Sequence, residues 1–245
     1  MKTFIKYILQ KLLGLKTYLY VFARFVIVKI RWDKKEKDFF HLMKLISEDG
    51  IILDLGANIG VTSYHLAKNF PNSTVYSFEP LDLNMTTLKR IKEKFGIKNI
   101  KEIQVAVGDT NGTIEMIMPV VKNVPMHGLS HVVENESSQE DSGFKYEVPL
   151  ISLDNYAELN NTKEKITALK IDVENFEYSV LKGATKLLKE HNPVIYCELW
   201  DNENRTKCIS LLDNLGYSAF VLNKKELVPF EASSRNKHNF FFVHN

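Results

Sequence analysis

The sequence predicts an α/β protein built on a doubly wound, mostly parallel β-sheet of about seven strands. Short apolar, β-branched runs alternate along the chain with longer segments that carry apolar residues at helical spacing, which is typical of strand–helix–strand units. Several of the runs end at an acidic residue, the position where such sheets bind ligands. At 245 residues, the chain can form one substantial domain with an appendage.

From residue 51 onward, strands and helices are expected in alternation. Residues 113–118 follow a glycine-containing turn and predict an added hairpin, and residues 146–152 are extended. Residues 119–143 are polar and irregular, and a connection of that length is typical of a binding or lid segment. The main strands are expected at 51–54, 74–79, 100–107, 166–172, 193–199, 217–222 and 239–243, and the helices at 61–69, 82–95, 176–189 and 201–215.

The segment Asp-Leu-Gly-Ala-Asn-Ile-Gly, residues 54–60, is a candidate ligand-binding turn. It lies between a strand and a helix, so backbone N–H groups and a helix N-terminus can meet a ligand there. Gly56 permits the tight turn, and Gly60 permits close packing. The dinucleotide fingerprint needs a glycine where Asn58 stands. Asp54 would repel a phosphate but could pair with an ammonium group. This combination suits S-adenosylmethionine, which has no phosphate.

The second expected strand ends at Glu79, which lies 23 residues beyond Gly56. In nucleotide-binding βαβ units, an acid about 20 residues after the glycine turn binds the ribose hydroxyls. Glu79 is therefore a candidate for that contact. The carboxyl ends of parallel strands meet at one edge of the sheet, so we expect Asp54, Glu79, Val107, Asp172 and Glu198 to converge.

Five motifs occur in a fixed order: residues 54–60, Phe-Glu-Pro at 78–80, Ala-Val-Gly-Asp at 106–109, Ser-Leu-Asp at 152–154, and Lys-Ile-Asp-Val-Glu-Asn-Phe-Glu at 170–177 followed by Val-Leu-Lys-Gly-Ala. Together they resemble the FkbM family of S-adenosylmethionine-dependent methyltransferases, over about residues 45–243. The family often has a glycine where this chain has Asn175. Asparagine tolerates the left-handed backbone angles that such a turn needs.

The resemblance implies the class I methyltransferase (Rossmann-like) fold, with seven strands of which the last is antiparallel. It also implies methyl transfer, usually to a hydroxyl group, with sugars, glycolipids, polyketides or other secondary metabolites as acceptors. We expect S-adenosylmethionine to contact Asp54, Gly56, Ala57, Asn58, Gly60, Glu79, Ala106, Val107 and Asp172.

A hydroxyl group is a poor nucleophile and benefits from a side chain that accepts its proton. The catalytic candidates, in order of preference, are Glu174, Asp172 and Glu198, followed by His127 and His131 of the 119–143 segment. On the next helix, Glu177 and Lys182 are expected at the surface.

Neither a metal site nor a disulfide is expected. The seven histidines lack ligand spacing, and the two cysteines, Cys197 and Cys208, form no framework. A reducing, cytoplasmic setting fits best.

Residues 1–44 form a basic arm ahead of the domain at 45–245. Residues 1–37 contain ten basic and two acidic residues, a net charge of +8, whereas the whole chain carries +2. Apolar residues recur in the arm at near-helical spacing. The longest charge-free stretch, residues 17–23, is far shorter than the roughly 20 residues of a membrane-spanning helix. Arg24 interrupts any signal peptide.

Two interpretations of the arm remain open. Residues 1–31 could lie on an anionic membrane, at its inner face, with lysines outward and apolar residues inward. Alternatively, the arm packs on the domain or on a second subunit in a homodimer. Nucleic acid is not expected as a partner, because the basic residues are interleaved with large aliphatic ones.

Two other functions compete with methyl transfer. A nicotinamide-dependent sugar-nucleotide oxidoreductase would share the glycine turn and the ribose-binding acid, and Tyr178 and Lys182 formally make its Tyr-x-x-x-Lys pair. It lacks the glycine needed at position 58. A non-catalytic adaptor could keep the fold and use the arm as a membrane tether, but the intact glycine turn and Glu79 argue against a decayed cofactor site.

Overall fold

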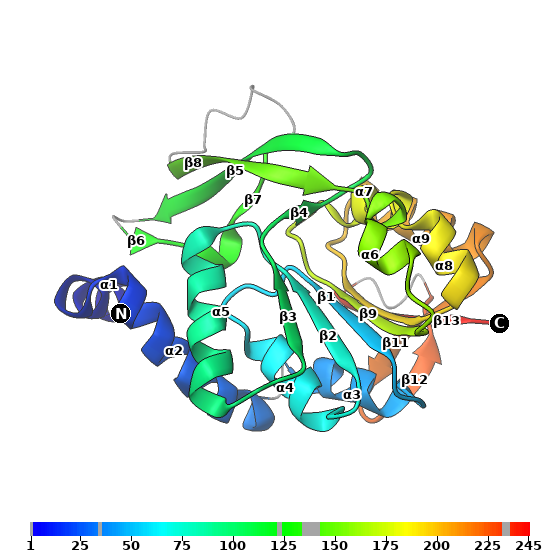
Figure 1. Ribbon diagram of the computed structural model, residues 1–245, viewed down its shortest axis with the longest axis horizontal. Coiled ribbons are helices and arrows are strands. Elements are labelled where there is room, and N and C mark those ends of the chain that lie inside the picture. Colours follow the sequence, from blue (N-terminus) through cyan, green and yellow to red (C-terminus); the bar gives the residue numbers. More distant parts are fainter. Residues whose placement is uncertain (1, 34–35, 122–123, 134–142, 232–235) are drawn as a thin grey trace.

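A computed structural model describes residues 2–33, 36–121, 124–133, 143–231 and 236–245. Its centre is an eight-stranded sheet in the order β12-β11-β13-β10-β9-β1-β2-β3 (Figure 1). The strands from β10 to β3 are parallel, whereas β13 is antiparallel to both of its neighbours. The strands are β1 (Ile51–Leu55), β2 (Thr74–Phe78), β3 (Ile100–Ile103), β9 (Ile166–Ile171), β10 (Val194–Glu198), β11 (Tyr217–Asn223), β12 (Glu226–Pro229) and β13 (Asn239–His244).

This topology confirms the predicted doubly wound, mostly parallel sheet with an antiparallel last strand. The sheet has one strand more than expected, because the chain turns back after β11 and forms β12. Lys224 makes this turn in the left-handed region, with φ of 56°. The extra strand lies at the edge of the sheet farthest from β3.

Helices cover both faces of the sheet, and the strands alternate their side chains between them. Ile51, Leu53 and Leu55 of β1 join one apolar core, and Ile52 joins the other. A strand buried on both faces reads as a continuous apolar run, which is why residues 51–53 predict a strand. The first core is covered by α6 (Ala157–Asn160), α7 (Glu177–Lys182), α8 (Thr185–His191) and α9 (Glu203–Asn214), and the second by α3 (Lys37–Leu45), α4 (Val61–Asn69) and α5 (Asp82–Phe95).

The strand predicted at 100–107 is wrong as a single element. β3 ends at Ile103, and β4 (Ala106–Val107) leaves the main sheet to pair in parallel with Leu150 and Ile151 of β8. β8 (Gly143–Ile151) also pairs antiparallel with β5 (Gly112–Val121), so the strand predicted at 113–118 is present, but the predicted hairpin with the strand before it is wrong, because β8 lies between β4 and β5. A local apolar pattern cannot reveal that a strand changes sheets.

The helix predicted at 176–189 is also wrong as a single element, because it divides into α7 and α8 at Gly183. A side-chain carbon at Gly183 would overlap the carbonyl oxygen of Gly108. Asp154 then caps the N-terminus of α8, accepting hydrogen bonds from the backbone N–H groups of Lys186 and Leu187, both at 2.9 Å. The Ser-Leu-Asp motif thus has a structural role.

The described part of residues 119–143 contains more regular structure than the predicted irregular loop. β5 continues to Val121 and is followed by β6 (Val124–Pro125), the 3₁₀ turn η2 (His127–Leu129) and β7 (His131–Val132). Residues 134–142 lie outside the described part of the chain. Figure 1 shows this second sheet above the carboxyl ends of β1 and β2. The role of residues 119–143 as a lid stays a prediction.

The N-terminal arm is helical, as predicted, and forms α1 (Lys2–Leu13) and α2 (Leu15–Lys29), followed by the 3₁₀ turn η1 (Ile30–Trp32). α2 packs on α4 and α5 through Leu19, Ala23 and Ile27, which share a core with Ile91. The buried ring of His65 donates from Nε2 to the carbonyl oxygen of Ile27, 3.1 Å away. The inner face of α2 therefore belongs to the folded domain. In the described ranges, no helix is long and apolar enough to cross a membrane.

We expect Leu19→Ala to lower the free energy of unfolding by about 2–5 kcal/mol, the range for truncating a fully buried leucine. Leu19 has no exposed surface. The matched control is Val21→Ala on the exposed side of the same helix, which should change stability by no more than about 0.5 kcal/mol. Urea unfolding of both variants checks this. Equal stability of the two would mean that α2 does not pack on the domain in solution.

Candidate active site

A pocket lies between the carboxyl ends of the main strands and the second sheet. Its floor comes from the loops after β1, β2 and β9 and from the start of α5, and its roof comes from the second sheet and η2. The residues that line it are Gly56, Asn58, Phe78, Glu79, Pro80, Asn84, Val105, Ala106, Val107, Met116, His127, Gly128, Ser130, Val132, Asp172, Val173, Glu174 and Phe176.

Two glycines shape the turn after β1. Gly56 has a φ of 76°, and a side chain there would overlap the carbonyl oxygen of Asp172. Gly60 caps α4 with a φ of 81°, and its α-carbon faces Leu88, whose Cγ would lie 2.8 Å from an added Cβ. The N–H of Gly56 also donates to the carbonyl oxygen of Phe78, at 3.1 Å. Both glycines therefore have the roles that the sequence predicted, a tight turn and close packing.

Glu79 is buried at the end of β2 and lines the pocket. Its carboxylate accepts hydrogen bonds from the backbone N–H of Asn58 at 3.0 Å, the backbone N–H of Leu81 at 2.9 Å and the side-chain amide of Asn84 at 3.2 Å. Burial raises the pKa of this carboxyl to about 7, and the three donors oppose the rise. Glu79 thus connects the glycine turn to α5 while facing the pocket.

Asp54 is fully buried, and the described residues that line the pocket do not include it. One of its carboxylate oxygens accepts hydrogen bonds from the hydroxyl groups of Thr62 at 2.7 Å and Ser63 at 2.6 Å, and the other lies 3.4 Å from the ammonium nitrogen of Lys170. Asp54 therefore holds the start of α4 against the end of β1. Its predicted direct contact with the cofactor stays a prediction.

Lys170 is the most important residue that the sequence reasoning missed. Its buried ammonium nitrogen donates to the carbonyl oxygen of Gly56 at 2.9 Å and lies 3.4 Å from Asp54 and 3.5 Å from Asp172. Burial alone would lower the pKa of Lys170, but the two carboxylates outweigh it and leave the pKa raised. In the sequence, the signal for such a role is a single lysine in an otherwise apolar strand, two residues before Asp172.

The three predicted catalytic acids lie at the ends of β9 and β10. Asp172 and Glu174 line the pocket, whereas Glu198 is outside its described lining. Burial, followed by the charges of Asp172 and Glu198, raises the pKa of Glu174 to about 8. Burial, followed by the charge of Asp172, raises the pKa of Glu198 to about 7. The charge of Asp172 thus acts on both glutamates, in addition to burial.

The turn between β9 and α7 has two consecutive left-handed residues, Glu174 with φ of 51° and Asn175 with φ of 74°. Asn175 therefore adopts the conformation expected from its place in the motif. The carboxylate of Glu177 accepts hydrogen bonds from the backbone N–H groups of Val173 at 3.3 Å and Asn175 at 3.1 Å. The predicted surface position of Glu177 is wrong, since the residue is 1% exposed. Lys182 is exposed and pairs with Asp109.

The pocket contains buried polar atoms without partners among the described residues. These are both ring nitrogens of His127 and the side-chain carbonyl oxygens of Asn58 and Asn84. Burial lowers the pKa of His127 to about 4, so its ring is neutral. An unsatisfied buried polar atom costs about 1–3 kcal/mol, and such groups indicate a polar ligand. The amino-acid and ribose groups of S-adenosylmethionine can supply these hydrogen bonds, so the residues present fit this cofactor.

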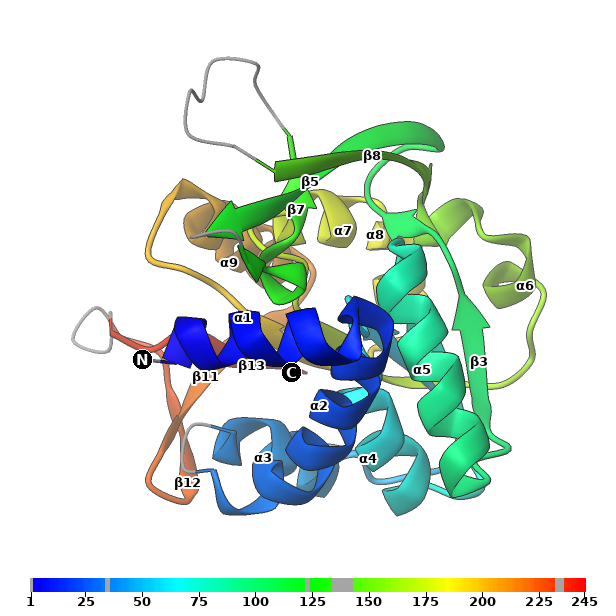
Figure 2. The same cartoon turned by 90° about the vertical axis from the view of Figure 1, so that its left-hand side faces the viewer.

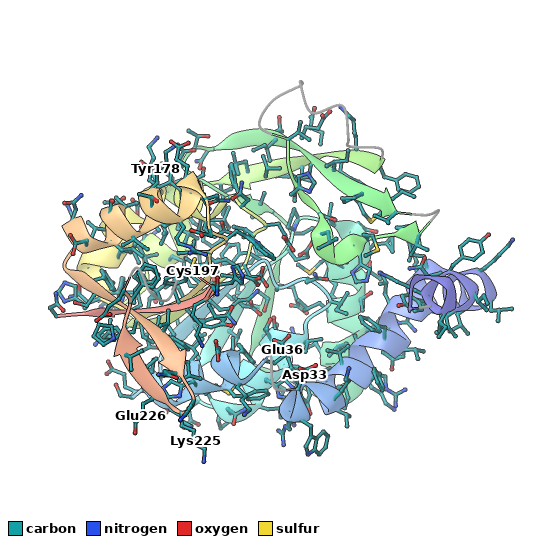
Figure 3. The ribbon with its side chains drawn as sticks, turned by 180° about the vertical axis from the view of Figure 1, so that it is seen from behind. Asp33, Glu36, Tyr178, Cys197, Lys225 and Glu226 are labelled. Carbon is teal, nitrogen blue, oxygen red and sulfur yellow. The ribbon has the colours of Figure 1, made fainter. Side chains whose placement is uncertain are left out.

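The structure does not bring every candidate to the pocket. His131, in β7, is not among the described residues that line the pocket. Ala57 and Gly60 are also not among them, although both belong to the turn after β1. Tyr178 and Lys182 are also outside the described lining, and Figure 3 shows Tyr178 at the outer side of the helical layer. The nicotinamide interpretation therefore has no tyrosine–lysine pair at the pocket. In the described part of the chain, no group of three or more His, Cys, Asp or Glu could hold a metal ion.

The strand order, with one antiparallel strand between β10 and β11, and the pocket at the carboxyl ends of the parallel strands define a class I S-adenosylmethionine-dependent methyltransferase. The family comparison agrees with this class. The model of the methyltransferase FkbM domain matches residues 54–219. The chain belongs to this family and uses S-adenosylmethionine as its methyl donor.

Two curated relatives are also methyltransferases. Methyltransferase 1 of Beauveria bassiana (strain ARSEF 2860) is 26% identical over 190 residues, covering 71% of this chain and 74% of the relative. Methyltransferase sdnD of Sordaria araneosa is 25% identical over 204 residues, covering 74% of this chain and 78% of the relative.

A crystal structure of methyltransferase FkbM from Methylobacillus flagellatus KT is similar to this fold, with a TM-score of 0.50 and 17% sequence identity. The match covers 80% of this chain but only 44% of that longer one. The likeness therefore concerns the fold of the shared part.

We expect Glu79→Ala to weaken the binding of S-adenosylhomocysteine at least tenfold. A hydrogen bond to a charged carboxylate contributes about 1.5–3 kcal/mol, and the ribose hydroxyls would lose that acceptor. Stability should fall as well, because the N–H groups of Asn58 and Leu81 lose their acceptor. Isothermal titration calorimetry measures the dissociation constant, with Glu226→Ala at the far edge of the sheet as the control (Figure 3). An unchanged constant would remove Glu79 from the cofactor contacts.

Lys170→Met should lower the free energy of unfolding by about 3–5 kcal/mol, because it leaves the buried carboxylate of Asp54 without its counter-charge. Lys182→Met is the control, since that ion pair with Asp109 is largely exposed and exposed pairs contribute about 1 kcal/mol or less. Chemical denaturation compares the two variants. Similar small losses in both would contradict a central role for Lys170.

Proposed function

We propose that this methyltransferase methylates a hydroxyl group of a sugar, of a glycolipid or polysaccharide precursor, or of a secondary metabolite. The observation that carries the proposal is the position of Glu174, which lines the cofactor pocket and lies among two further carboxyl groups. A hydroxyl acceptor needs a nearby group that takes up its proton. The FkbM family resemblance supports the same class of acceptor.

When bound, S-adenosylmethionine supplies a methyl group on a positively charged sulfur, and the carbon–sulfur bond breaks with its electron pair left on sulfur. The acceptor oxygen forms the new bond to carbon and gives up its proton. Glu174 is the preferred proton acceptor, because its raised pKa makes its carboxylate more basic than an ordinary one. Burial keeps the pKa of Glu174 high, and the negative charges of Asp172 and Glu198 add to this effect. Asp172 and Glu198 each remain a second candidate for the proton.

We place this reaction in the cytoplasm. Cys197 and Cys208 are free thiols, and both are buried in the first apolar core. Figure 3 shows Cys197 in the interior of the molecule. Buried unpaired thiols are compatible with a reducing compartment. A role in the synthesis of an envelope polysaccharide would fit a cytoplasmic enzyme that acts on a lipid-linked precursor.

The test measures transfer of a labelled methyl group to a panel of soluble glycosides, lipid-linked sugars, polyketide alcohols and amines. We expect label on a hydroxyl oxygen, with a rate that rises with pH through about 8, because Glu174 accepts a proton only when it is ionised. Glu174→Gln should lower kcat by about 10²–10⁴-fold, the usual contribution of a general base, and remove this rise. Binding of S-adenosylhomocysteine should change little.

The control for the Gln substitution is Glu226→Gln at the exposed edge strand. Label on nitrogen instead of oxygen would contradict the proposed acceptor. An unchanged pH profile in Glu174→Gln would assign the proton to another group, and Glu198→Gln is then the next variant. Absence of transfer to every acceptor class, with normal cofactor binding, would favour the non-catalytic adaptor.

A further inference from the structure

The N-terminal segment of α1, α2 and η1, residues 2–32, is here called the hairpin. Its helix α2 has a second apolar face, on the side away from α4 and α5. On α2 and η1, Val21, Phe25, Val28 and Trp32 follow one another at intervals of four, three and four residues, so they form one stripe. Their exposed fractions are 48%, 59%, 59% and 75%. α2 is thus apolar on two sides, and only the inner side is covered by α4 and α5.

α1 carries further exposed apolar residues. Its residues Ile5, Ile8, Leu9, Leu12 and Leu13 are all exposed, at the spacing of one broad helical face. Figure 2 shows α1 and α2 in front of the other elements on that side of the molecule. Singly exposed apolar residues are ordinary in soluble proteins, but apolar stripes on two adjacent helices mark an interaction surface.

The charges of the hairpin decide between the possible occupants. From residue 2 to residue 32 the sequence has no acidic residue, and Lys11, Lys16, Arg24, Lys29 and Arg31 are exposed. A second copy docked through the same patch would bring like charges together, since an isologous contact uses one surface twice. An anionic lipid surface has the opposite charge and attracts each lysine or arginine.

We propose that these exposed apolar and basic residues of α1, α2 and η1, here called the hairpin face, dock on an anionic lipid membrane. The helices would lie in the headgroup region without crossing it, with Phe25 and Trp32 inserted and the basic side chains beside the lipid phosphates. Tryptophan prefers this interface, because its ring is apolar and its N–H is polar.

The hairpin also touches the roof of the cofactor pocket. The ring of Phe22 packs edge-on against His127, with centroids 6.4 Å apart, and the ammonium nitrogen of Lys6 lies 3.5 Å from the sulfur of Met126. A docked enzyme would therefore hold its pocket roof close to the lipid headgroups. This placement suits an acceptor that is itself attached to a lipid, although lipid docking does not depend on which acceptor is methylated.

The experiment is co-sedimentation of the full-length protein with phosphatidylcholine vesicles that contain or lack phosphatidylglycerol. Wild type should sediment with the anionic vesicles only, and less so as salt rises, because salt screens the attraction. Phe25→Ser combined with Trp32→Ser should weaken this binding at least tenfold. Phe144→Ser combined with Val243→Ser removes two exposed apolar residues elsewhere and should leave binding unchanged.

Melting temperature and S-adenosylhomocysteine affinity of the hairpin variant establish that the fold and the pocket are intact. Wild type that ignores anionic vesicles would overturn the proposal, as would a hairpin variant that still binds like wild type. Sedimentation velocity adds a separate outcome. A wild-type dimer that the Phe25 and Trp32 substitutions dissociate would assign the hairpin face to a second copy. None of these results depends on methyl transfer, so they leave the proposed reaction to its own test.

Discussion

The buried ammonium group of Lys170 holds together the loops from which the cofactor site is made. It binds the carbonyl oxygen of Gly56 in the turn after β1 and lies close to the carboxylates of Asp54 and Asp172. A buried charge is tolerated only where opposite charges and hydrogen bonds surround it, so each of these contacts requires the others. Asp54 in turn fixes the first turn of α4 through Thr62 and Ser63. The position of the pocket floor follows from this one arrangement.

Much of the fold and of the cofactor site could be predicted from the sequence, because both depend on local patterns. The run at residues 51–53 is apolar since both faces of β1 are buried, and Gly56 is glycine since the turn after β1 needs a left-handed φ of 76°. Glu79 could be recognised from its place at the end of an expected strand and its spacing after the glycine turn. In each case the structure restricts the residue types within one short segment of the chain. Such a restriction can be recognised in the sequence.

The features that could not be predicted depend on contacts between distant segments. The departure of β4 from the main sheet is set by its pairing with β8, and the break between α7 and α8 is set by the approach of Gly108 to Gly183. Glu177 looks like a surface acid by helical spacing, yet it is buried, and the side-chain amide of Asn204 in α9 donates to its carboxylate at 2.6 Å beside the N–H groups of the turn at 174–175. The sequence pattern does not show these partners, because folding brings them together. The roof residue His127 was likewise indistinguishable from a solvated loop histidine.

The charges around the pocket distinguish the buried acid Asp54 from the acids that line the pocket. The sequence suggested that Asp54 pairs with an ammonium group, but that charge is already neutralised by Lys170. Asp172 also lies close to Lys170, at 3.5 Å, so among the described residues the acid that lines the pocket without an ion pair is Glu174, whose pKa is raised to about 8. Crowded carboxyl groups hold protons because their charges repel one another, and a cation among them favours ionisation. A cofactor that carries a sulfonium brings such a cation to the pocket, so a larger fraction of Glu174 would be ionised, and able to accept a proton, when the methyl group is in place.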